Sequence, residues 1–593
     1  MNTKNGYSSA TSTLLLDSIR SSAKTTLFND LDEQEGVKMI IWESSVMKHV
    51  DLLIPYNEFT NHNVKSHRVL PDKPSEDLRA YPIDGIQHVY YVIPPIKKFF
   101  VKVMECLAVK LTARPKVHVR VLTRIPKSLH EFFVEDTRVR QRQPSLEAWP
   151  FFWLPAFGDF LLNNFASVTP ARLLVSDDFE LFFLCAAALN DVFTARRIYW
   201  RGEWAKQVVQ NLQTLKPTPQ SSNCIFDSLI VVDRILDPIS PLLQQFSFAG
   251  VLDSMFGISI KGVVEVHEEV LKQVLPLAEA KEGKLEKIAL TSEIYTQIVH
   301  SSIGDALKVV RKYLRELADI ETAHGQLTSI NDFKQYMPSL QKLVKSKAVA
   351  SQAFRLCSIC FCYCAQSEHR KQLECERDIL SGHFNQSTMI DYVEELILNA
   401  ESEDDGSRAI RLIVLQSLVN GGLTLKLWNE YQKLLVQSFG PVAVTWCLNL
   451  QQISGLVQIS GTQQTRFAHV STDIKRLKAV IENEQDPSAA YFNGYVSLLV
   501  RILERGQREV WKGFETYANS QLKNLPAINV DVPTTTADAR VRTGASKRTA
   551  LFVIGGLTRA EIACLRAQPN PFAAIFTTQI LKPQDMIDFR VTN

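Results

Sequence analysis

The stretch 228–258, SLIVVDRILDPISPLLQQFSFAGVLDSMFGI, constrains the fold more than any other part of the chain. Leu229–Val232 are four consecutive strand formers that run directly into Asp233-Arg234. Asp237 and Pro241 follow, and then comes an amphipathic run that ends in a glycine. The pattern predicts a buried strand that ends in a charged pair, then a proline-braced turn, and then a short helix.

Length and charge narrow the class of protein. The 593 residues are 46% apolar and 22% charged, which is typical of a folded protein with several cores. A net charge of +3, from 66 basic and 63 acidic side chains, disfavours nucleic acid as the main ligand. The longest apolar run, Leu181–Leu189, is about half as long as a membrane span requires. Ten irregularly spaced cysteines favour reduced thiols and a cytoplasmic location.

Strand signals occur at both ends of the chain and vanish in its middle. Between about residues 260 and 525 long helical periodicities replace them, and only a short tail follows the Thr-rich stretch 526–548. That tail is too short for a core of its own, so we expect it to complete the earlier sheet. Alternation of strands with crossovers predicts parallel, doubly wound sheets. The expected strands are Val37–Trp42, Val50–Pro55, His88–Ile93, Val117–Leu122, Ala171–Val175, Leu229–Val232, Ala550–Ile554 and Phe572–Thr577.

A helical hairpin is expected near residues 300–345. Its first helix carries apolar residues at spacings of four and three, which is coiled-coil spacing: Ile303, Leu307, Val310, Leu314 and Leu317. Its second helix continues the pattern with Phe333, Met337, Leu340 and Val344, and Pro338 must either start or kink it. The stripe serves either packing within the hairpin or docking of partner helices. Lys308, Arg311, Lys312 and Arg315 line one face, which is either solvated or matched to an acidic partner helix.

Three motifs can be interpreted either as chemical sites or as structural features. Asp233, Arg234 and Asp237 form either a phosphate or catalytic site or an arginine held by carboxylates. Gly555-Gly556, between a strand and a capping box, is either a nucleotide turn or a tight packing turn, and no complete phosphate-loop motif occurs. The cysteines of CSICFCYC lack a second pair at zinc-finger spacing, which favours a buried helix over zinc or redox chemistry.

These motifs resemble the SM (Sec-one/Munc-eighteen-like) family of SNARE chaperones. The signature of that family is matched by Asp233, Arg234, Asp237, Pro241, Leu242, Leu243, Gly250 and Gly257. Segment 551–562, which contains Gly555 and Gly556, is similar to the vacuolar protein sorting (class C, endolysosomal) branch, and so is the block 407–457.

The resemblance implies a three-domain, arch-shaped α/β fold with a large helical insertion. The domains expected are an N-terminal α/β domain at 1–145 and a discontinuous α/β domain at 146–250 plus 546–593. The helical domain is expected at 251–545, with the hairpin in 251–370 and a helical subdomain and loop in 371–545.

The function implied is binding, with no enzymatic activity, no cofactor and no metal. The resemblance implies that the hairpin templates SNARE assembly with syntaxin-like and vesicle SNARE helices, through Ile303, Leu307, Val310, Arg311, Leu314, Arg315, Leu317, Phe333, Met337 and Leu340. It also implies that the helical subdomain binds a large scaffold subunit of an endolysosomal tethering complex, with Phe439, Val444 and Trp446 as anchors or as core residues. Membrane association is then peripheral, on endosome, lysosome or vacuole. The alternatives are a scaffold subunit that does not bind SNAREs and a nucleotide-dependent enzyme.

Overall fold

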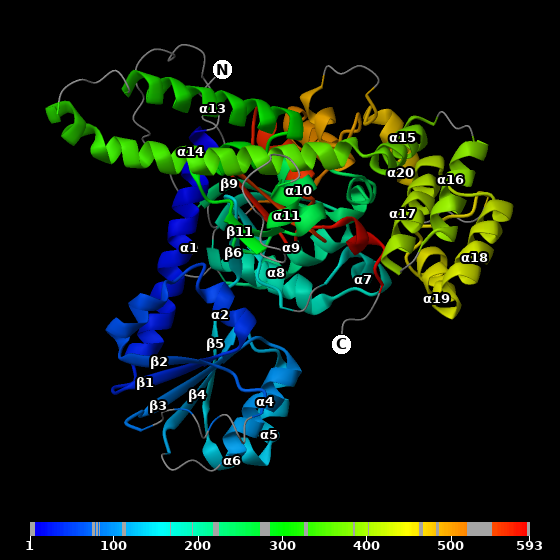
Figure 1. Cartoon of the computed structure of the whole chain (residues 1–593). Coiled ribbons are helices and arrows are strands. Elements are labelled where there is room, and N and C mark those ends of the chain that lie inside the picture. The colour runs from blue at the N-terminus through cyan, green and yellow to red at the C-terminus, as the bar shows by residue number, and fades with distance from the viewer. Residues whose placement is uncertain are drawn as a thin grey trace.

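The computed structural model describes residues 6–73, 78, 81, 84–109, 114–165, 168–192, 194–216, 225–272, 285–324, 330–382, 386–400, 403–461, 466–481, 486–518 and 548–589. Two sheet-containing bodies lie one below the other in Figure 1, and a long helical hairpin and a helical subdomain extend from the upper body.

The lower body is built on a five-stranded parallel sheet with the order β2-β1-β3-β4-β5. Alternate residues of each strand enter different cores, because successive side chains point to opposite faces. Met39 and Ile41 enter the core beneath α4, whereas Ile40 and Trp42 enter the core beneath α1. The strands are β1 (Lys38–Trp42), β2 (Val64–Val69), β3 (His88–Ile93), β4 (Lys116–Leu122) and β5 (Ser145–Trp149), and the helices are α1 (Gly6–Asp32), α2 (Ser44–Val50), α4 (Lys97–Ala108), α5 (Lys127–Glu135) and α6 (Thr137–Arg142).

Helix α1 connects the two bodies (Figure 1). Leu15 belongs to the large core of the upper body, while Leu27 and Leu31 belong to a core of the lower body. At its C-terminal end Asp30 binds Arg120 Nη2 at 2.6 Å and accepts a hydrogen bond from the Trp149 indole at 2.8 Å. One helix therefore holds residues of both cores.

The upper body is built on a seven-stranded sheet with the order β12-β8-β9-β13-β14-β7-β6. Its five inner strands are parallel, and the edge strands β12 and β6 are antiparallel. The strands are β6 (Trp153–Ala156), β7 (Asp159–Leu162), β8 (Thr194–Arg201), β9 (Ile225–Asp233), β12 (Glu515–Ala518), β13 (Thr549–Ile554) and β14 (Ala574–Thr577), with helices α7 (Pro170–Val175), α8 (Phe179–Val192), α9 (Glu203–Thr214), α10 (Phe248–Phe256) and α22 (Arg559–Ala567) around them.

The C-terminal strands occupy the middle of this sheet. β13 pairs with β9, so that Phe552 lies beside Val231, and β14 pairs with β7. This is the pairing that the shortness of the tail predicts. The three-domain division stays a prediction, although β5 lies in the first sheet beyond the expected boundary at 145 and β12 joins the second sheet from within the expected helical domain.

Two expected strands are helical or turn structure instead. Val50 ends α2 and the residues after it form turns, while Ala171–Val175 lies in α7. Short apolar runs do not separate a buried strand from a buried helix. The usable signal for α7 was Thr169-Pro170, because Thr169 caps the helix and Pro170 occupies its first turn.

The middle region is mostly helical, but it is not free of strands. β10 (Val263–His267) and β11 (Leu285–Ala289) form an antiparallel pair of their own, which the sequence did not predict. The helices are α11 (Glu268–Lys272), α12 (Glu293–Ile298), α13 (Ile303–His324), α14 (Ile330–Ala365), α15 (Ser367–Ser381), α16 (Gln386–Leu398), α17 (Glu403–Asn420), α18 (Leu425–Phe439), α19 (Pro441–Leu448), α20 (His469–Arg476) and α21 (Leu498–Arg508).

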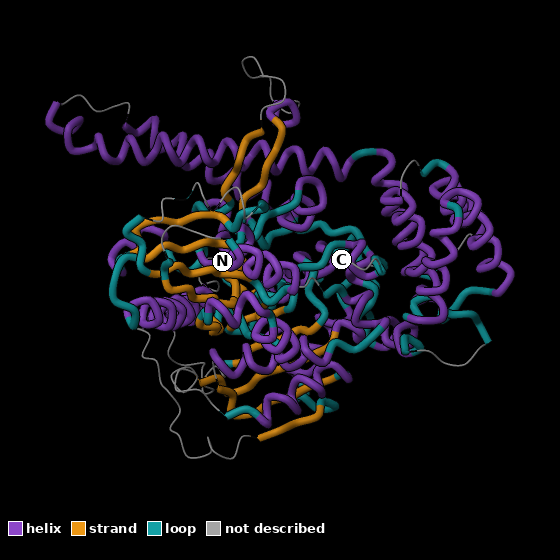
Figure 2. The backbone as a smooth tube through the Cα atoms, turned by 90° about the horizontal axis from the view of Figure 1, so that it is seen from below, coloured by secondary structure: helices purple, strands orange, loops and turns teal. Residues whose placement is uncertain are grey.

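Helices α13 and α14 form the expected hairpin, and Figures 1 and 2 show its free end extending well beyond the body. α14 begins at Ile330, so Pro338 lies inside the helix and not at its start. The segment Leu343–Ala365 of α14 is long and apolar enough to cross a membrane by length and composition. One side of this segment, with Ala353, Leu356 and Cys357, is fully buried in a core with α10 and α13, and 33% of its apolar window is buried in all.

A directed chain of hydrogen bonds crosses the lower sheet near the end of α1. His88 Nε2 donates to the Glu35 carbonyl at 2.9 Å, so His88 Nδ1 accepts from His118 Nε2 at 3.1 Å. His118 Nδ1 in turn accepts from the Ser145 hydroxyl at 2.8 Å, and that oxygen accepts from Arg120 at 3.0 Å. Two neutral imidazoles satisfy every hydrogen bond of this chain.

Stability is expected to fall in mild acid because of this chain. Burial, reinforced by the charge of Arg120, lowers the pKa of His118 to about 4, and burial lowers the pKa of His88. The unfolded chain binds protons below about pH 6.5 and the folded chain does not, so stability present at pH 7 is lost as the pH falls toward 4.

We expect His118 to contribute about 2 kcal/mol to the loss between pH 7 and pH 5. Urea denaturation at both values measures this loss, and a His118→Gln variant should show a smaller difference between them. The control is His130→Gln, which changes an exposed histidine of α5. Equal pH dependence in the two variants would contradict the assignment.

Candidate functional site

Asp233 ends β9 and caps α9, the helix that precedes β9 in the chain. Its carboxylate accepts hydrogen bonds from the backbone N–H groups of Trp204 at 2.9 Å and Ala205 at 2.6 Å, in the first turn of α9. Gly202, which precedes α9, has a φ of +112°, and a Cβ there would lie 2.1 Å from the Asp233 carboxylate. Asp233 is fully buried, and its role in this position is structural.

Arg234 is the centre of a buried network that joins distant parts of the chain. Its Nη1 lies 2.8 Å from Glu561 Oε2, its Nε donates to the Asp237 carbonyl at 2.9 Å, and its Nη2 lies 3.5 Å from Asp237 Oδ2. Ser497, at the start of α21, donates toward Asp237 at 2.6 Å or Glu561 at 2.9 Å. Burial raises the pKa of Glu561, and the charge of Arg234 opposes that rise.

This geometry supports the structural interpretation of the signature residues. Arg234, Asp237 and Glu561 are fully buried, so no ligand reaches them in this structure. Pro241 is also buried, in the one-turn helix Ser240–Leu242 that follows Asp237. The network ties the end of β9 to α21 and α22, which come from the far end of the sequence.

Gly555-Gly556 is a packing turn. The two residues have φ values of +89° and +97°, and a Cβ on Gly555 would lie 2.7 Å from Arg234 Cβ. The N-terminus of α22 is already occupied, since Thr558 and Glu561 form a capping box and Gln245 accepts from the Ala560 N–H at 3.0 Å. The donors that a nucleotide phosphate needs are therefore used by protein groups, which removes the basis for the nucleotide alternative at this turn.

The cysteine cluster lies on α14. Cys357 and Cys360 are fully buried, and burial raises the pKa of Cys357 to about 12. Cys362 is exposed on another face of the helix. Within the described ranges no three His, Cys, Asp or Glu side chains gather as a metal site. The buried-helix interpretation fits this arrangement.

The apolar stripe of α13 holds the hairpin together. Ile303, Val310 and Leu317 are buried, and Leu307 and Leu314 are half-buried and pack on the same cores. Their partners include Leu343, Ala350 and Ala353 of α14, so the stripe packs within the hairpin, and direct binding of partner helices through these residues stays a prediction. The side chains of Phe333, Met337 and Leu340 lie outside the part of the chain that the structure describes.

The outer face of the hairpin is charged, with single apolar residues among the charges. Lys308, Arg311, Lys312 and Arg315 are all exposed. Lys308 pairs with Asp305 and Lys312 with Glu316 along the helix, whereas Arg311 and Arg315 form no ion pair with any described residue. Ile320 is 44% exposed and Val344 is 66% exposed. Sequence periodicity missed Ile320, which lies off the repeating stripe, and it placed Val344 in the stripe although the structure exposes that residue.

The helical subdomain exposes an apolar surface on α18, α19 and the following π-helical turn Asn449–Ile453. Phe439 and Trp446 are half-buried, with ring centroids 5.3 Å apart, and Phe439 packs against Gly406. Val444 is exposed, and its role as an anchor stays a prediction. The exposed apolar residues of these elements are Leu425, Val436, Val442, Val444, Leu448 and Ile453. Val444 and Leu448 share a face of α19, whereas Val442, two residues before Val444, does not. Apart from Val444 the sequence reasoning missed them, although α19 is apolar on all sides, a signal that one face needs a partner.

A second set of exposed apolar residues lies on the upper body. Val175, Phe179 and Phe183 are 44%, 65% and 37% exposed, and Phe179 and Phe183 share a face of α8. Val175 lies in α7, and α7 contacts the π-helical turn Asn449–Ile453 of the helical subdomain. The sequence analysis did not predict that these three residues are exposed.

Truncating the buried arginine should destabilise the upper body. An Arg234→Met substitution leaves Glu561 and Asp237 buried without their cation, so we expect a loss of about 3–5 kcal/mol. Hydrogen exchange of the β9 and β13 amides measures this loss. The control is Arg505→Met on α21, whose partner Glu509 is also solvent-accessible, and a change of at most about 1 kcal/mol is expected there. Similar exchange in both variants would contradict the role given to Arg234.

Comparison with known proteins places the chain in a family. The model of the Sec1 family matches residues 38–589. Vacuolar protein sorting-associated protein 33A of Caenorhabditis elegans is 25% identical over 96% of this chain and 95% of its own, and that of Rattus norvegicus is 23% identical over 93% and 92%. The fold is that of the SM protein Vps45 in complex with the Qa SNARE Tlg2 (TM-score 0.59, 14% identity, 96% of this chain and 97% of that chain). It is also that of the Unc18–syntaxin 1 complex from Monosiga brevicollis (TM-score 0.59, 14% identity, 96% and 98%). The chain therefore belongs to the Sec1 family of SM proteins.

Proposed function

We propose that this protein binds SNARE helices and chaperones their assembly for vesicle docking and fusion with endosomes, lysosomes or the vacuole. The Sec1 family is a SNARE-binding family without enzymatic activity. Its relatives over nearly the full length carry the name of vacuolar sorting proteins, and solved structures with the same fold hold Qa SNAREs. In this proposal the protein binds SNAREs and associates with membranes peripherally, through its partner proteins.

The observation that carries the proposal is the projecting hairpin. Its inner stripe is buried, so the two helices support each other and keep the outer face straight. SNARE motifs are unstructured before they zipper, and ordering them costs conformational entropy. A preformed helical surface that aligns two such chains lowers that cost at the moment of assembly.

The residues proposed for SNARE contact are those of the outer face. Arg311 and Arg315 present guanidinium groups without an ion-pair partner in the described part, one turn apart on α13. The guanidinium carbon of Arg311 lies 5.7 Å from the centroid of the Phe354 ring, so the guanidinium group lies over that ring of α14. Leu317 is buried, so a Leu314→Asp, Leu317→Asp variant would disrupt the hairpin itself and would not isolate docking.

We propose that the apolar surface of α18 and α19 binds a large scaffold subunit of a tethering complex. Val444 and Leu448 lie one turn apart on α19 with 46% and 44% exposure, and half-buried Trp446 and Phe439 support the surface from below. Exposed apolar side chains gathered on one subdomain are typical of a protein–protein interface. Val175 is exposed on α7, which contacts the turn that follows α19.

The hairpin prediction is tested with charge reversal. An Arg311→Glu, Arg315→Glu variant should bind purified syntaxin-like and vesicle SNARE motifs at least about tenfold more weakly, because two favourable contacts become repulsive toward acidic partner helices. Titration calorimetry measures the affinity. A Lys426→Glu, Lys433→Glu variant makes the same charge change on exposed positions of α18 and should bind normally. Unchanged affinity in the first variant would place SNARE contact elsewhere on the chain, whereas no binding by the unmodified chain would favour the alternative of a scaffold subunit without SNARE affinity.

Binding of the scaffold subunit to the apolar surface of α18 and α19 is tested in a separate experiment. A Val444→Asp, Leu448→Asp variant should lose binding to the purified scaffold subunit and keep its affinity for SNARE motifs, because the two surfaces lie on different helices. Pull-down with quantified recovery measures both. Leu285→Asp, which places a charge at an exposed apolar position of β11, serves as the control. Full recovery of the scaffold subunit by the double variant would place its binding site elsewhere.

A further inference from the structure

The turn between β6 and β7 is built around a residue that such turns disfavour. Phe157 and Gly158 are its two central residues, with φ values of +53° and +90°. A two-residue hairpin turn with two positive φ values prefers asparagine, aspartate or glycine, and an aromatic side chain there is strained. Strain of this kind persists only where other contacts hold the residue in place.

The contacts that hold Phe157 come from the base of the hairpin. The hairpin base comprises β10, β11 and α12, which share one core with α10 and with the adjoining ends of α13 and α14. The Phe157 ring packs on this core, and a Cβ on Gly262 would lie 3.2 Å from the ring. The Phe157 carbonyl oxygen lies 3.5 Å from Nε2 of His300, shortly before α13. Phe157 is therefore a wedge that the upper body inserts into the hairpin base.

The wedge is anchored firmly in the upper body. Asp159, which follows the turn, is buried and forms an ion pair with Arg566 of α22. Arg559, at the start of α22, has its guanidinium carbon 5.7 Å from the centroid of the Phe157 ring. It also binds Asp253 of α10 at 2.8 Å. The two arginines hold the turn and the neighbouring helix together, so the wedge is a rigid point of contact.

The lower body reaches the same place. Gly262 closes a tight turn, residues 259–262, in which its N–H donates to the Ser259 carbonyl at 2.8 Å. Lys261 of this turn forms an ion pair with Asp51, which follows α2 at the end of the lower body nearest the upper body (Figure 1). The two side chains are 42% and 30% exposed, and ion pairs in such positions are weak. The turn thus meets a packed ring of the upper body and an easily broken contact of the lower body.

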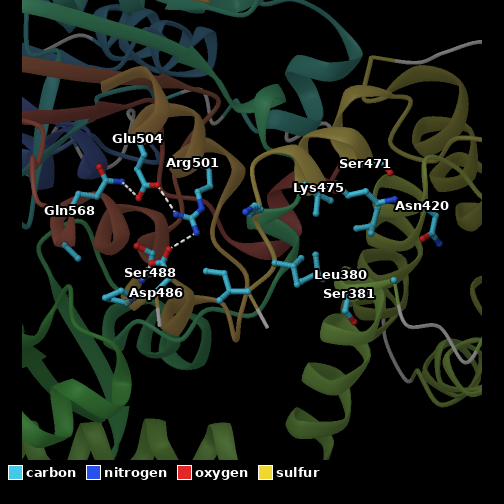
Figure 3. A pocket seen from close by; sticks show the side chains of 18 of the residues that line it. Leu380, Ser381, Asn420, Ser471, Lys475, Asp486, Ser488, Arg501, Glu504 and Gln568 are labelled. Carbon is cyan, nitrogen blue, oxygen red and sulfur yellow. Dashed lines mark hydrogen bonds and ion pairs between the residues drawn. The ribbon is translucent and has the colours of Figure 1, made fainter. Parts of the chain in front are cut away.

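The helical subdomain meets the upper body in a different way. A cleft of about 1420 Å³ lies between them, and Figure 3 shows its lining. Arg501 binds Asp486 at 2.7 Å and Glu504 at 3.0 Å, all on the side of the upper body. None of the interactions drawn in Figure 3 crosses the cleft. Of these two junctions, the turn 259–262 is the one where side chains from three parts of the molecule meet.

We propose that the turn 259–262 is a joint that sets the angle between the lower body and the hairpin. Phe157 is the fixed point of this joint. The ion pair between Asp51 and Lys261 is its latch, which holds the lower body against the hairpin base and opens without disturbing either core.

The joint acts on the hairpin through β10. Val264 and Val266 follow the turn directly and lie in the same core as Val310 of α13, so the position of the turn is tied to that of the hairpin. Only residues 150–152 separate β5 of the lower sheet from β6 of the upper sheet. With the latch open, the lower body turns about this short segment and α1. The proposal does not depend on which partners the hairpin binds.

The latch is tested by measuring the distance between the lower body and the hairpin in the full chain. Spin labels are attached at Lys65→Cys on β2 and Lys312→Cys on α13, two exposed positions. The background is Cys224→Ser, Cys362→Ser, Cys364→Ser, in which the native thiols that remain are buried. Double electron–electron resonance then gives the distance distribution. We expect an Asp51→Lys substitution to broaden it at least about twofold, because repulsion replaces the ion pair.

The charge-swapped variant, Asp51→Lys, Lys261→Asp, should restore the narrow distribution, which a merely structural effect of the substitutions would not do. High salt should broaden the distribution of the unmodified chain, since the pair is exposed. The control is Lys287→Glu on β11, which reverses one charge of an exposed ion pair with Glu265 within the hairpin base. It should leave the distribution unchanged.

The wedge is tested with Phe157→Asn. This substitution creates Asn-Gly, the favoured sequence for such a turn, so the turn is kept while the ring is lost. We expect hydrogen exchange of the β10 amides to become at least about tenfold faster and that of the β7 amides to stay unchanged.

Any of three results would overturn the proposal. An unchanged distribution in Asp51→Lys means that the ion pair does not hold the lower body. Equal broadening in Asp51→Lys and in the charge-swapped variant means that the effect does not come from the pair. Unchanged exchange of β10 in Phe157→Asn removes Phe157 as the fixed point. Thermal unfolding of each variant, expected within a few degrees of the unmodified chain, excludes misfolding as the cause of a change.

Discussion

The buried ion pair between Arg234 and Glu561 supports the arrangement on which the rest of the molecule depends. Arg234 follows β9 and Glu561 lies in the first turn of α22, more than half the sequence away, while Ser497 brings in the start of α21. A buried charge is tolerated only with its partners in place, so this contact specifies one way of closing the sheet. Because the helical region leaves and re-enters the upper body beside this network, its position on the body follows from the same contact.

The hairpin separates support from recognition. Its coiled-coil stripe is buried between α13 and α14, and the opposite face carries exposed arginines. A helix that used one stripe for both purposes would lose its own packing whenever a partner bound. Division into an inner apolar face and an outer polar face lets a surface remain rigid without a ligand, which preorganised binding requires.

Much of the architecture could be predicted from the sequence because strong local signals agreed with each other. The run from Leu229 to Asp233, the capping box at Thr558 and the heptad spacing from Ile303 each correspond to a strand, a helix start and a hairpin in the structure. The prediction of a strand at Ala171–Val175 was wrong because buried short strands and buried short helices have similar compositions. The exposure of Leu448 and Phe179 was not predictable, since periodicity reports which residues are apolar and not whether a neighbour covers them.

The placement of β13 between β9 and β14 has a consequence for biosynthesis. During translation β9 leaves the ribosome long before its neighbour exists, and the whole helical region is made while one edge of a very apolar strand is unpaired. Such an edge is a template for wrong pairing, with other chains as well as within this one. We therefore expect this edge to need shielding until the last strands emerge, and a chain that ends before β13 lacks the strand that closes the central sheet.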